Sequence, residues 1–368
     1  MSEEVTLRVQ LKKLTGFCVR VFQELGVPED DASITADVLV MADLRGIASH
    51  GVARLRRYVD GLRNSVMFAK PDVKVVKETP ATALIDAGAG LGQPVSYKAM
   101  ETAIKKAKEV GAGFVTVRNS NHYGIAGYYA MMALENDCIG MSMTNADVLV
   151  VPTFGQNAML GTNPIAIAAP ANREQPFVMD MATSTVPRGK LEVYDRAGKP
   201  IPVGWATDER GLGTSDTHRV LENLKSRRGG GLLPLGGEGE LLSGYKGYGL
   251  ALWVDIFCAV LSGAAYATLV YPKTPDGKPL PANLGHFFGA WSIDAFRPVD
   301  EFKAAMDDLQ HQLKNSPKAE GQDRIYIHGE KEYEKMEAYT RDGIPLNPKV
   351  ATDLKAIAQE LSVEYDLE

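Results

Sequence analysis

Residue types able to move a proton and bind an anion occur close together at His50 and Arg54, in the segment SHGVARL. On a helix, residues four apart project from one face, so both side chains would reach one ligand. Arg54 would bind a carboxylate, and together with a helix start it would lower the pKa of His50 until the imidazole exchanges a proton near neutrality. This chemistry suits a 2-oxo or 2-hydroxy acid, whose carboxylate neighbours the reacting oxygen. A surface histidine beside a solvated arginine would give the same spacing.

A second histidine, His122, ends the polar run RNSNH, after the strand-like GFVTV and before a helical segment. Loop residues in such a position commonly face a cleft, which favours a functional role. Alternatively, Asn119, Ser120 and Asn121 only cap the helix that follows. The other histidines show neither metal-ligand spacing nor a carboxylate partner, so we predict no metal site.

Three further loops place small polar groups beside a strand or a helix start, in MLGTNPIA, MDMATSTV and LSGYKGYG. Their candidate ligand groups are Gly161, Thr162, Asn163, Asp180, Thr183, Ser184 and Lys246. Each loop alone is also typical of an ordinary strand entry or of a solvated turn. Together they predict a cleft for a large anionic ligand, because hydroxyl, amide and ammonium groups bind sugars and phosphates.

The segment ALIDAGAGLGQPVSYKAM has the order strand, turn, helix of a dinucleotide-binding unit. Its glycines Gly88, Gly90 and Gly92 follow G-x-G-x-G, and Gln93 stands where the last glycine of G-x-G-x-x-G belongs. The next strand-like run ends in Arg118 instead of the acidic residue that would hold a ribose hydroxyl. We therefore interpret the glycines as turn residues and predict no Rossmann site.

The composition is that of a globular protein: 368 residues, 45% hydrophobic and 23% charged. Lys and Arg number 40 against 46 Asp and Glu, and the resulting net charge of −6 disfavours a nucleic-acid partner. Cys18, Cys138 and Cys258 are far apart, which predicts neither a disulfide framework nor a zinc cluster and favours a reducing compartment. The start MSEEVTLRVQLKK lacks signal-peptide features, so we expect a cytoplasmic protein.

One apolar stretch, from Gly247 to Tyr271, is long enough to cross a bilayer. It contains Asp255, whose insertion would cost a few kcal/mol, and no excess of Lys or Arg flanks it. We therefore predict a buried core helix and no membrane partner.

Apolar residues at three- and four-residue spacing predict three helices early in the chain, over about 7–26, 28–44 and 50–64. Ser49 is the predicted N-cap of the third helix. This places His50 at a helix start within a helical region.

The middle of the chain consists of short β-rich runs, interrupted by predicted helices over about 94–110 and 125–135. Helical patterns return near the C-terminus. We predict a mixed α/β protein, with a helical domain built from residues 1–70 and about 298–368 and a sheet-containing domain over 71–297.

The chain resembles the type 2 malate/L-lactate dehydrogenase family through SHGVARL, RNSNHYGIAGYY, MSMTNA with PTFG, MLGTNPIA, MDMATS, PVGWATD, PLGGEGE, GYKGYGLAL and IPLNPKV, in that order. That family also contains sulfolactate and ureidoglycolate dehydrogenases, diketogulonate reductase and piperideine-carboxylate reductase. The similarity covers nearly the whole chain. It implies a cytoplasmic oxidoreductase that uses NAD or NADP, forms a homodimer, and binds the cofactor on a largely antiparallel, non-Rossmann sheet in the 71–297 domain.

The resemblance also implies roles for single residues. The catalytic histidine falls on His50, with Ser49 beside it, and a second proton acceptor falls on His122. Arg54 binds the substrate carboxylate, and Thr162 is a further substrate-binding candidate. The implied cofactor contacts are Asp180, Met181, Ala182, Thr183, Ser184, Thr185, Val186, Tyr245, Lys246, His328, Gly329 and Glu330.

Two positions depart from the family pattern. His328 stands where members commonly have proline, which affects the local turn. Arg188 replaces a commoner small residue after DMATS, where its charge could influence the choice between NAD and NADP.

The implied reaction is hydride transfer between the nicotinamide ring and C2 of a small 2-oxo acid, with oxaloacetate and L-malate as the first expectation. Lactate, sulfolactate, ureidoglycolate or a cyclic imino acid are alternative substrates on the same fold. A non-catalytic anion-binding protein is the alternative from a different functional class.

Overall fold

The computed structural model describes residues 7–368, and its centre is a seven-stranded sheet in the order β2-β3-β4-β10-β5-β6-β7. Neighbouring strands are antiparallel, except for the parallel pair β3 and β4. This confirms the predicted mixed α/β class with a largely antiparallel sheet. The strands are β2 (Lys74–Glu78), β3 (Thr82–Asp86), β4 (Ala112–Ser120), β5 (Cys138–Thr144), β6 (Ile165–Ala169), β7 (Phe177–Met181) and β10 (Leu284–Ser292).

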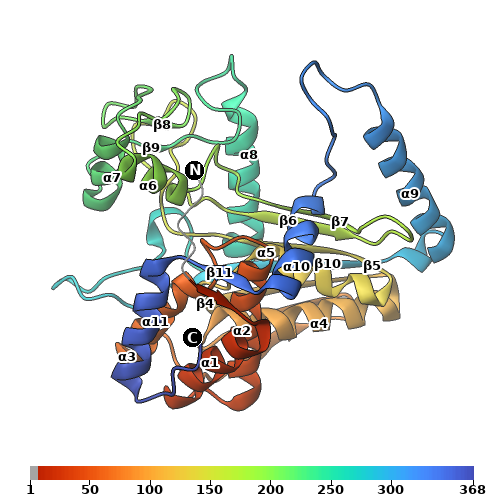
Figure 1. Ribbon diagram of the computed structural model, residues 1–368, viewed down its shortest axis with the longest axis horizontal. Helices are drawn as coiled ribbons and strands as arrows, with labels where there is room; N and C mark the ends of the chain where they lie inside the picture. Colours follow the sequence, from red (N-terminus) through yellow and green to blue (C-terminus); the bar gives the residue numbers. More distant parts are fainter. Residues whose placement is uncertain (1–6) are drawn as a thin grey trace.

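Helices α4 (Gly92–Val110) and α5 (Ala126–Met132) cover one face of this sheet (Figure 1). Glycines allow the close approach: a Cβ at Gly113 of β4 would lie 2.1 Å from a carbonyl oxygen of α4, and a Cβ at Gly140 of β5 would lie 2.1 Å from one of α5. A side chain at either position would push the helix off the sheet.

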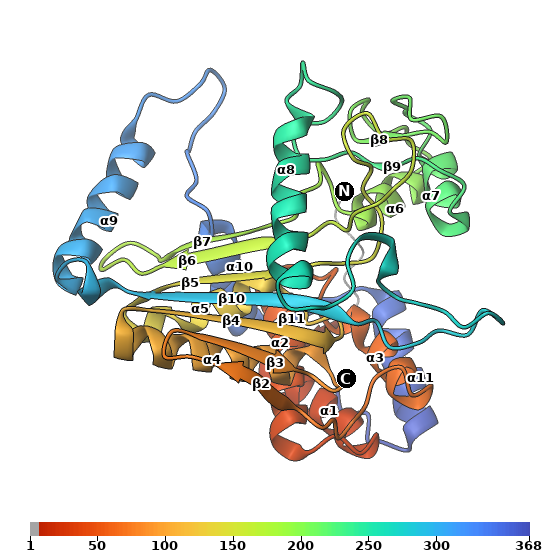
Figure 2. The ribbon, with the colours of Figure 1, turned by 180° about the vertical axis from the view of Figure 1, so that it is seen from behind.

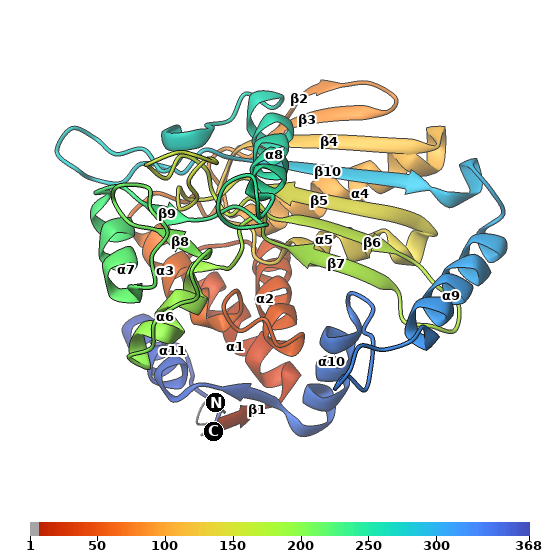
Figure 3. The ribbon, with the colours of Figure 1, turned by 90° about the horizontal axis from the view of Figure 1, so that it is seen from above.

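The opposite face carries α8 (Gly244–Asp255) and α9 (Val299–Asn315), which rise from it at separate places (Figures 2 and 3). Residue Val254 of α8 packs on the sheet against Met143 and Ile165. Beside α9 the sheet face is open, and a cavity of about 600 Å³ lies there. Its apolar lining residues are Ile139, Met141, Ile167, Trp291, Ile293, Phe296 and Phe302.

A helical lobe joins the two ends of the chain around one hydrophobic core, which contains residues from Val9 to Leu367. Its helices are α1 (Leu11–Glu24), α2 (Glu29–Leu44), α3 (Leu55–Arg63) and α11 (Pro348–Leu361), with α10 (Glu330–Asp342) alongside. The predicted helix over 7–26 is wrong at its start. Residues Leu7–Val9 form β1, which pairs with the distant β11 (Ile344–Leu346).

A third, smaller core lies near α8 and contains Val150, Leu191 and Leu232. It is surrounded by α6 (Arg188–Arg196), α7 (Thr217–Ser226), β8 (Ala206–Thr207) and β9 (Gly231–Leu232) (Figure 1). Irregular loops connect these short elements.

The apolar stretch Gly247–Tyr271 is not the buried core helix that its composition predicts. After α8 the chain makes a π-helical turn at Ile256–Val260 and then becomes irregular. Leu252, Ile256 and Val260, on successive turns, are 41%, 46% and 58% exposed. Within residues 7–368, no helix has both the length and the hydropathy that crossing a bilayer requires.

Candidate active site

His50 lies in an irregular segment between α2 and α3, and not at the helix start itself. A short 3₁₀ turn begins at Val52 and continues into α3. The predicted N-cap at Ser49 is wrong, because the backbone N–H of Val52 donates to Oδ2 of Asp43 at 2.7 Å. A Cβ at Gly51 would lie 2.1 Å from this carboxyl group, so only glycine fits between His50 and the capped turn.

The helix start is therefore occupied by Asp43 and does not serve as the anion site expected from the sequence. The positive charge beside His50 comes from the exposed Arg54, whose Nε donates to the carbonyl oxygen of Ser49 at 2.7 Å. This bond holds the guanidinium next to His50. It leaves the two terminal NH₂ groups of Arg54 for a ligand.

The structure brings His50 and His122 together. Their rings stack with centroids 5.6 Å apart and planes inclined by 20°. The two residues come from different parts of the fold, since His50 precedes α3 and His122 follows β4. The loop after β4 thus presents a histidine to the helical lobe.

Hydroxyl groups fix both imidazoles at Nδ1. Ser49 Oγ lies 2.9 Å from Nδ1 of His50, and Tyr58 Oη lies 2.6 Å from Nδ1 of His122. The backbone N–H of Gly124 also donates to Nδ1 of His122, at 3.4 Å, so neutral His122 carries its proton on Nε2. Among residues 7–368, no hydrogen bond engages Nε2 of either ring, so both Nε2 atoms are available to a substrate.

Tyr58 was not among the residues predicted from the sequence. It is fully buried on α3, and burial raises the pKa of its phenol above the ordinary value, so the group stays protonated and donates to His122. The signal that could have found it is its spacing, four residues after Arg54 on one helix face.

Both histidines are neutral at pH 7. Burial lowers the pKa of His50 to about 4, and the charges of Arg54 and Arg57 lower it further. Burial likewise holds the pKa of His122 well below its usual range, again with a contribution from Arg57. A neutral imidazole can accept a proton, and an anion bound at Arg54 would raise its proton affinity.

The RNSNH segment closes a turn instead of capping α5, which begins after Ile125 without a side-chain cap. The side-chain amide of Asn121 donates to the carbonyl oxygens of Ala89 and Gly90, at 3.0 and 2.8 Å. A Cβ at Gly92 would lie 2.3 Å from the carbonyl oxygen of Asn121. Although β3, α4 and β4 form a parallel crossover, protein atoms fill its glycine turn, so the fold contains no Rossmann site there.

Another histidine that the sequence did not single out, His286, supports this loop. It is fully buried on β10, with Nδ1 2.7 Å from Thr144 Oγ1 and Nε2 2.8 Å from Ser120 Oγ, and burial lowers its pKa to about 3. Its ring stacks on Tyr123 with centroids 4.6 Å apart. Since Ser120 and Tyr123 flank His122, His286 fixes the loop without facing a ligand.

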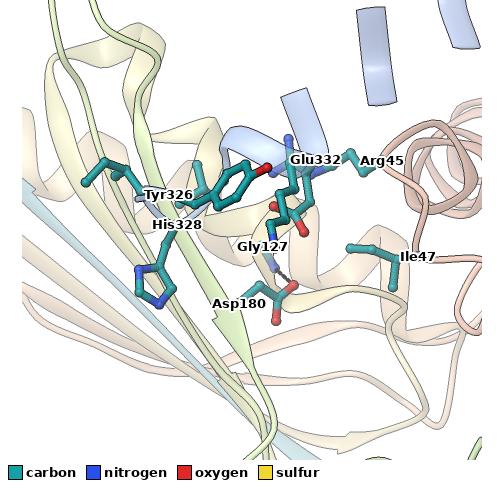
Figure 4. A pocket seen from close by; sticks show the side chains of 11 residues that line it. Arg45, Ile47, Gly127, Asp180, Tyr326, His328 and Glu332 are labelled. Atoms are coloured by element: carbon teal, nitrogen blue, oxygen red, sulfur yellow. Dashed lines mark hydrogen bonds between the residues drawn. The ribbon is translucent and has the colours of Figure 1, made fainter. Parts of the chain in front are cut away.

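Three of the predicted cofactor residues, Asp180, His328 and Gly329, line a cavity of about 270 Å³ together with residues that were not predicted (Figure 4). Arg45 and Ile47 border it at the end of α2, Asp180 at the end of β7, and His328 before α10. Oδ2 of Asp180 accepts from the backbone N–H of Gly127 at 2.7 Å. Ile47 lies three residues before His50, so one chain segment connects the cavity to the histidine pair.

The loop after β7 uses its hydroxyl hydrogens internally. Thr183 Oγ1 donates to the carbonyl oxygen of Thr162 at 3.1 Å, and Ser184 Oγ donates to that of Val186 at 2.9 Å. Thr185 likewise donates to a backbone carbonyl. Met181 and Ala182 join this loop to the strand. The arrangement stiffens the loop and brings Thr162 and Thr183 side by side.

Glu330 is buried and holds the turn before α10. Its carboxylate pairs with Lys314 at 2.5 Å and with Arg324 at 3.1 Å, and accepts the N–H of Ile327 at 3.0 Å. The adjacent Gly329 has a φ of +100° and lines the cavity, where its conformation favours glycine.

Tyr245 and Lys246 lie exposed in the first turn of α8 and do not line the 270 Å³ cavity. The helix start packs closely on Leu235, because a Cβ at Gly247 would lie 2.2 Å from the carbonyl oxygen of Leu235. The N–H of Leu235 donates to the carbonyl oxygen of Thr183 at 2.8 Å. These contacts connect α8 to the loop after β7.

Two stacked, neutral imidazoles beside a guanidinium can exchange a proton with a bound organic acid. The sequence profile of the malate/L-lactate dehydrogenase family matches residues 9–355, and the chain belongs to this family. Malate dehydrogenase from Pyrococcus horikoshii is 51% identical over 362 residues, 98% of either chain. L-sulfolactate dehydrogenase from Methanocaldococcus jannaschii is 42% identical over 349 residues, 95% of either chain.

Solved structures show the same fold. The crystal structure of malate dehydrogenase from Entamoeba histolytica matches with a TM-score of 0.93 and 35% identity, covering 98% of this chain and 99% of that one. Other relatives are a ureidoglycolate dehydrogenase (NAD⁺) from Escherichia coli and a (2R)-3-sulfolactate dehydrogenase (NADP⁺) from Chromohalobacter salexigens. The chain is thus an NAD(P)-dependent dehydrogenase.

Proposed function

We propose that the protein catalyses the reversible reduction of oxaloacetate to L-malate. The observation that carries this proposal is the stacked pair of His50 and His122, each with an unengaged Nε2, beside the guanidinium of Arg54. Two neutral imidazoles and one cation match a 2-oxo acid, which presents an oxygen to be protonated next to a carboxylate. The relative that is 51% identical is a malate dehydrogenase, which supports this substrate.

Each residue has a separate role in this proposal. Arg54 binds the C1 carboxylate and so fixes which face of C2 is presented. Nε2 of His50 gives a proton to the C2 oxygen during reduction and removes it from the hydroxyl during oxidation. His122 donates a hydrogen bond from Nε2–H to the substrate and orients it. Because His50 is neutral in the free enzyme, we expect a proton to be taken up as the oxo acid binds.

The 270 Å³ cavity has the chemistry to hold part of the cofactor. Asp180 and Glu332 offer carboxylates to ribose hydroxyls, while Arg45 and Lys331 offer cations to phosphate. A Cβ at Gly127 would lie 2.9 Å from Asp180 Oδ2, so glycine keeps this wall open. When bound, NADH or NADPH supplies the hydride. The loop from Met181 to Val186, and Tyr245, Lys246 and Glu330, remain proposed cofactor contacts.

Initial rates test the proposed substrate. With NADH and NADPH, we expect kcat/KM for oxaloacetate to exceed that for pyruvate by at least about 10-fold. The 2-oxo acids that correspond to sulfolactate and ureidoglycolate, and a cyclic imino acid, complete the panel. A higher kcat/KM for any of these would reassign the substrate. No turnover together with no change in NADH fluorescence would instead indicate a non-catalytic anion-binding protein.

We also propose a homodimer formed through the open sheet face beside α8 and α9. Apolar groups gather there: Ile256 and Val260 of the segment after α8 are about half exposed, and Phe296 beside the 600 Å³ cavity is 76% exposed. Exposed apolar surface of this kind is typical of subunit contacts.

Replacing Ile256 with glutamate should convert the dimer to monomer, because it places a charge in an apolar interface. Light scattering coupled to size exclusion measures the molar mass, expected to be twice the chain mass for the unmodified protein. Val75→Glu is the matched control, since Val75 is 59% exposed on the edge strand β2. A dimer that survives in Ile256→Glu would contradict this interface.

A cytoplasmic location is proposed on the state of the cysteines. Cys18, Cys138 and Cys258 are all buried and free. Burial raises the pKa of Cys18 and Cys258 above their ordinary values, which keeps these thiols unreactive. Free, uncrosslinked thiols suit a reducing compartment.

A further inference from the structure

A second guanidinium, that of Arg57, belongs to the residue next to Tyr58, whose hydroxyl contacts His122, and neither the sequence motifs nor the proposed reaction uses it. Arg57 follows Arg54 by three residues, so both project from the same side of the helical segment. The charge of Arg57 acts on both His50 and His122 and lowers their pKa values. The site therefore holds two cations and not one.

No carboxylate neutralises these two arginines within residues 7–368. Burial lowers the pKa of Arg54, an effect that the negative charge of Glu192 partly offsets, and the negative charge of Asp147 contributes to the raised pKa of Arg57. Neither carboxylate lies within ion-pair distance of its arginine. Glu192 instead pairs with Arg188 at 3.0 Å, and Asp147 with Arg227 at 3.7 Å. The exposed Arg54 and the half-buried Arg57, beside two neutral imidazoles, leave a local positive charge that a dianion would balance.

Arg57 is held in place by an aromatic residue. Its terminal NH₂ donates to Tyr271 Oη at 2.6 Å, and its guanidinium lies 5.5 Å from the centre of the Tyr271 ring. Tyr271 itself has a φ of +54°, a left-handed conformation that is unfavourable for a bulky residue. The backbone thus accepts strain at the residue that orients Arg57, as is common where a side chain has to be aimed at a ligand.

We propose that Arg57, oriented by Tyr271, binds the distal anionic group of the substrate and makes the enzyme selective for dianionic 2-oxo acids. Arg54 then binds the C1 carboxylate, and Arg57 binds the second carboxylate or a sulfonate in its place. A monoanion such as pyruvate leaves Arg57 without a partner. This inference rests on the proposed function and names the feature of the substrate that the site recognises.

The test compares Arg57→Gln with Arg56→Gln. Arg56 is the matched control because it pairs with Asp353 and Glu360 on α11, away from the histidines. In Arg57→Gln we expect kcat/KM for oxaloacetate to fall roughly 10- to 100-fold, the loss of one charge-assisted contact, while kcat/KM for pyruvate changes less than about threefold. Equal losses for both acids, or no loss for oxaloacetate, would overturn the proposal.

Two further variants distinguish a loss of recognition from a folding defect in Arg57→Gln. Arg57→Lys keeps the charge and should retain part of the preference for oxaloacetate over pyruvate. Tyr271→Phe removes only the hydroxyl that holds Arg57 and should reduce that preference without abolishing pyruvate turnover. If neither variant changes the ratio of the two kcat/KM values, Arg57 does not recognise the distal group.

A binding measurement separates this inference from the proposed function. Succinate and butyrate have equal chain lengths but carry two charges and one, so their effects on Tm, with and without NAD⁺, report the dianion site directly. We expect succinate to raise Tm of the unmodified protein and of Arg56→Gln more than butyrate does, and to lose this advantage in Arg57→Gln. An undiminished succinate effect in Arg57→Gln, or none in the unmodified protein, would refute the dianion site. Absence of any dehydrogenase turnover would refute only the proposed function.

Discussion

Replacing His50 with alanine is expected to lower kcat for oxaloacetate reduction by roughly 100- to 10,000-fold, the usual contribution of a positioned acid–base group. Nε2 of this imidazole has no hydrogen-bond partner among residues 7–368, and alanine leaves the C2 oxygen without the proposed proton donor. The Kd for NADH, measured by fluorescence titration, should remain within about twofold of the unmodified value, because His50 does not line the 270 Å³ cavity. Near-normal turnover would remove His50 from the mechanism.

The pH profile distinguishes His50 from a merely structural histidine. Its pKa of about 4 lies below the ordinary 6.5, so the neutral base needed for malate oxidation is present down to about pH 5 and is lost as the pH falls through 4. For reduction the sign is opposite, since the charged acid becomes scarcer as the pH rises. In His50→Ala both dependences should disappear from the residual rate, whereas a structural role would leave them unchanged.

Replacing Arg54 with glutamine is expected to lower kcat/KM for oxaloacetate by roughly 100-fold or more, mainly through KM. The variant loses the bidentate contact with the C1 carboxylate and also the Nε bond to Ser49 that places the guanidinium. Because every 2-oxo acid shares the C1 carboxylate, pyruvate should lose as much as oxaloacetate. Steady-state kinetics with both acids measures this.

Arg56→Gln again serves as the control for Arg54→Gln, since its partners Asp353 and Glu360 lie on α11. Its kcat/KM should stay within about threefold of the unmodified enzyme. An unchanged KM in Arg54→Gln would show that the carboxylate is bound elsewhere.

Elements encoded by local signals were predictable from the sequence. Helix α2 runs over Glu29–Leu44 as expected, with acidic residues in its first turn, and α4 ends at Gly111, which adopts the left-handed conformation that closes a helix. The rejection of a Rossmann site was also predictable, because glycine spacing is a local property. The structure shows the reason in space, where Asn121 fills the turn.

Features that depend on distant residues were not predictable. Strand β1 exists because β11 pairs with it from the other end of the chain, and local periodicity there favoured a helix. The 3₁₀ turn is capped by Asp43 on the preceding helix. Local sequence rules consider only neighbouring residues, so they predicted Ser49 as the N-cap. The spacing from Arg54 could place Tyr58 on the site's side of α3, but its contact with His122 joins residues 64 apart in sequence, which no local pattern predicts.

The apolar character of Gly247–Tyr271 was interpreted as burial within one chain. Part of this segment instead faces outward from α8 and the turn after it, as the exposure of Leu252, Ile256 and Val260 shows. Hydropathy indicates that a side chain is removed from water, but it does not distinguish burial within one chain from burial at a contact between two chains.

The stacked histidines are attached to different hydrophobic cores, since His50 precedes α3, which packs in the lobe built from both chain ends, and His122 precedes Tyr123, which packs with the sheet. Neither core alone assembles the pair. Weakening the attachment of the lobe, for example by trimming α11, would therefore separate the two histidines and abolish turnover while the seven-stranded sheet stayed folded. The turnover rate therefore reports the relative position of the helical lobe and the sheet more sensitively than a spectroscopic measurement of secondary structure does.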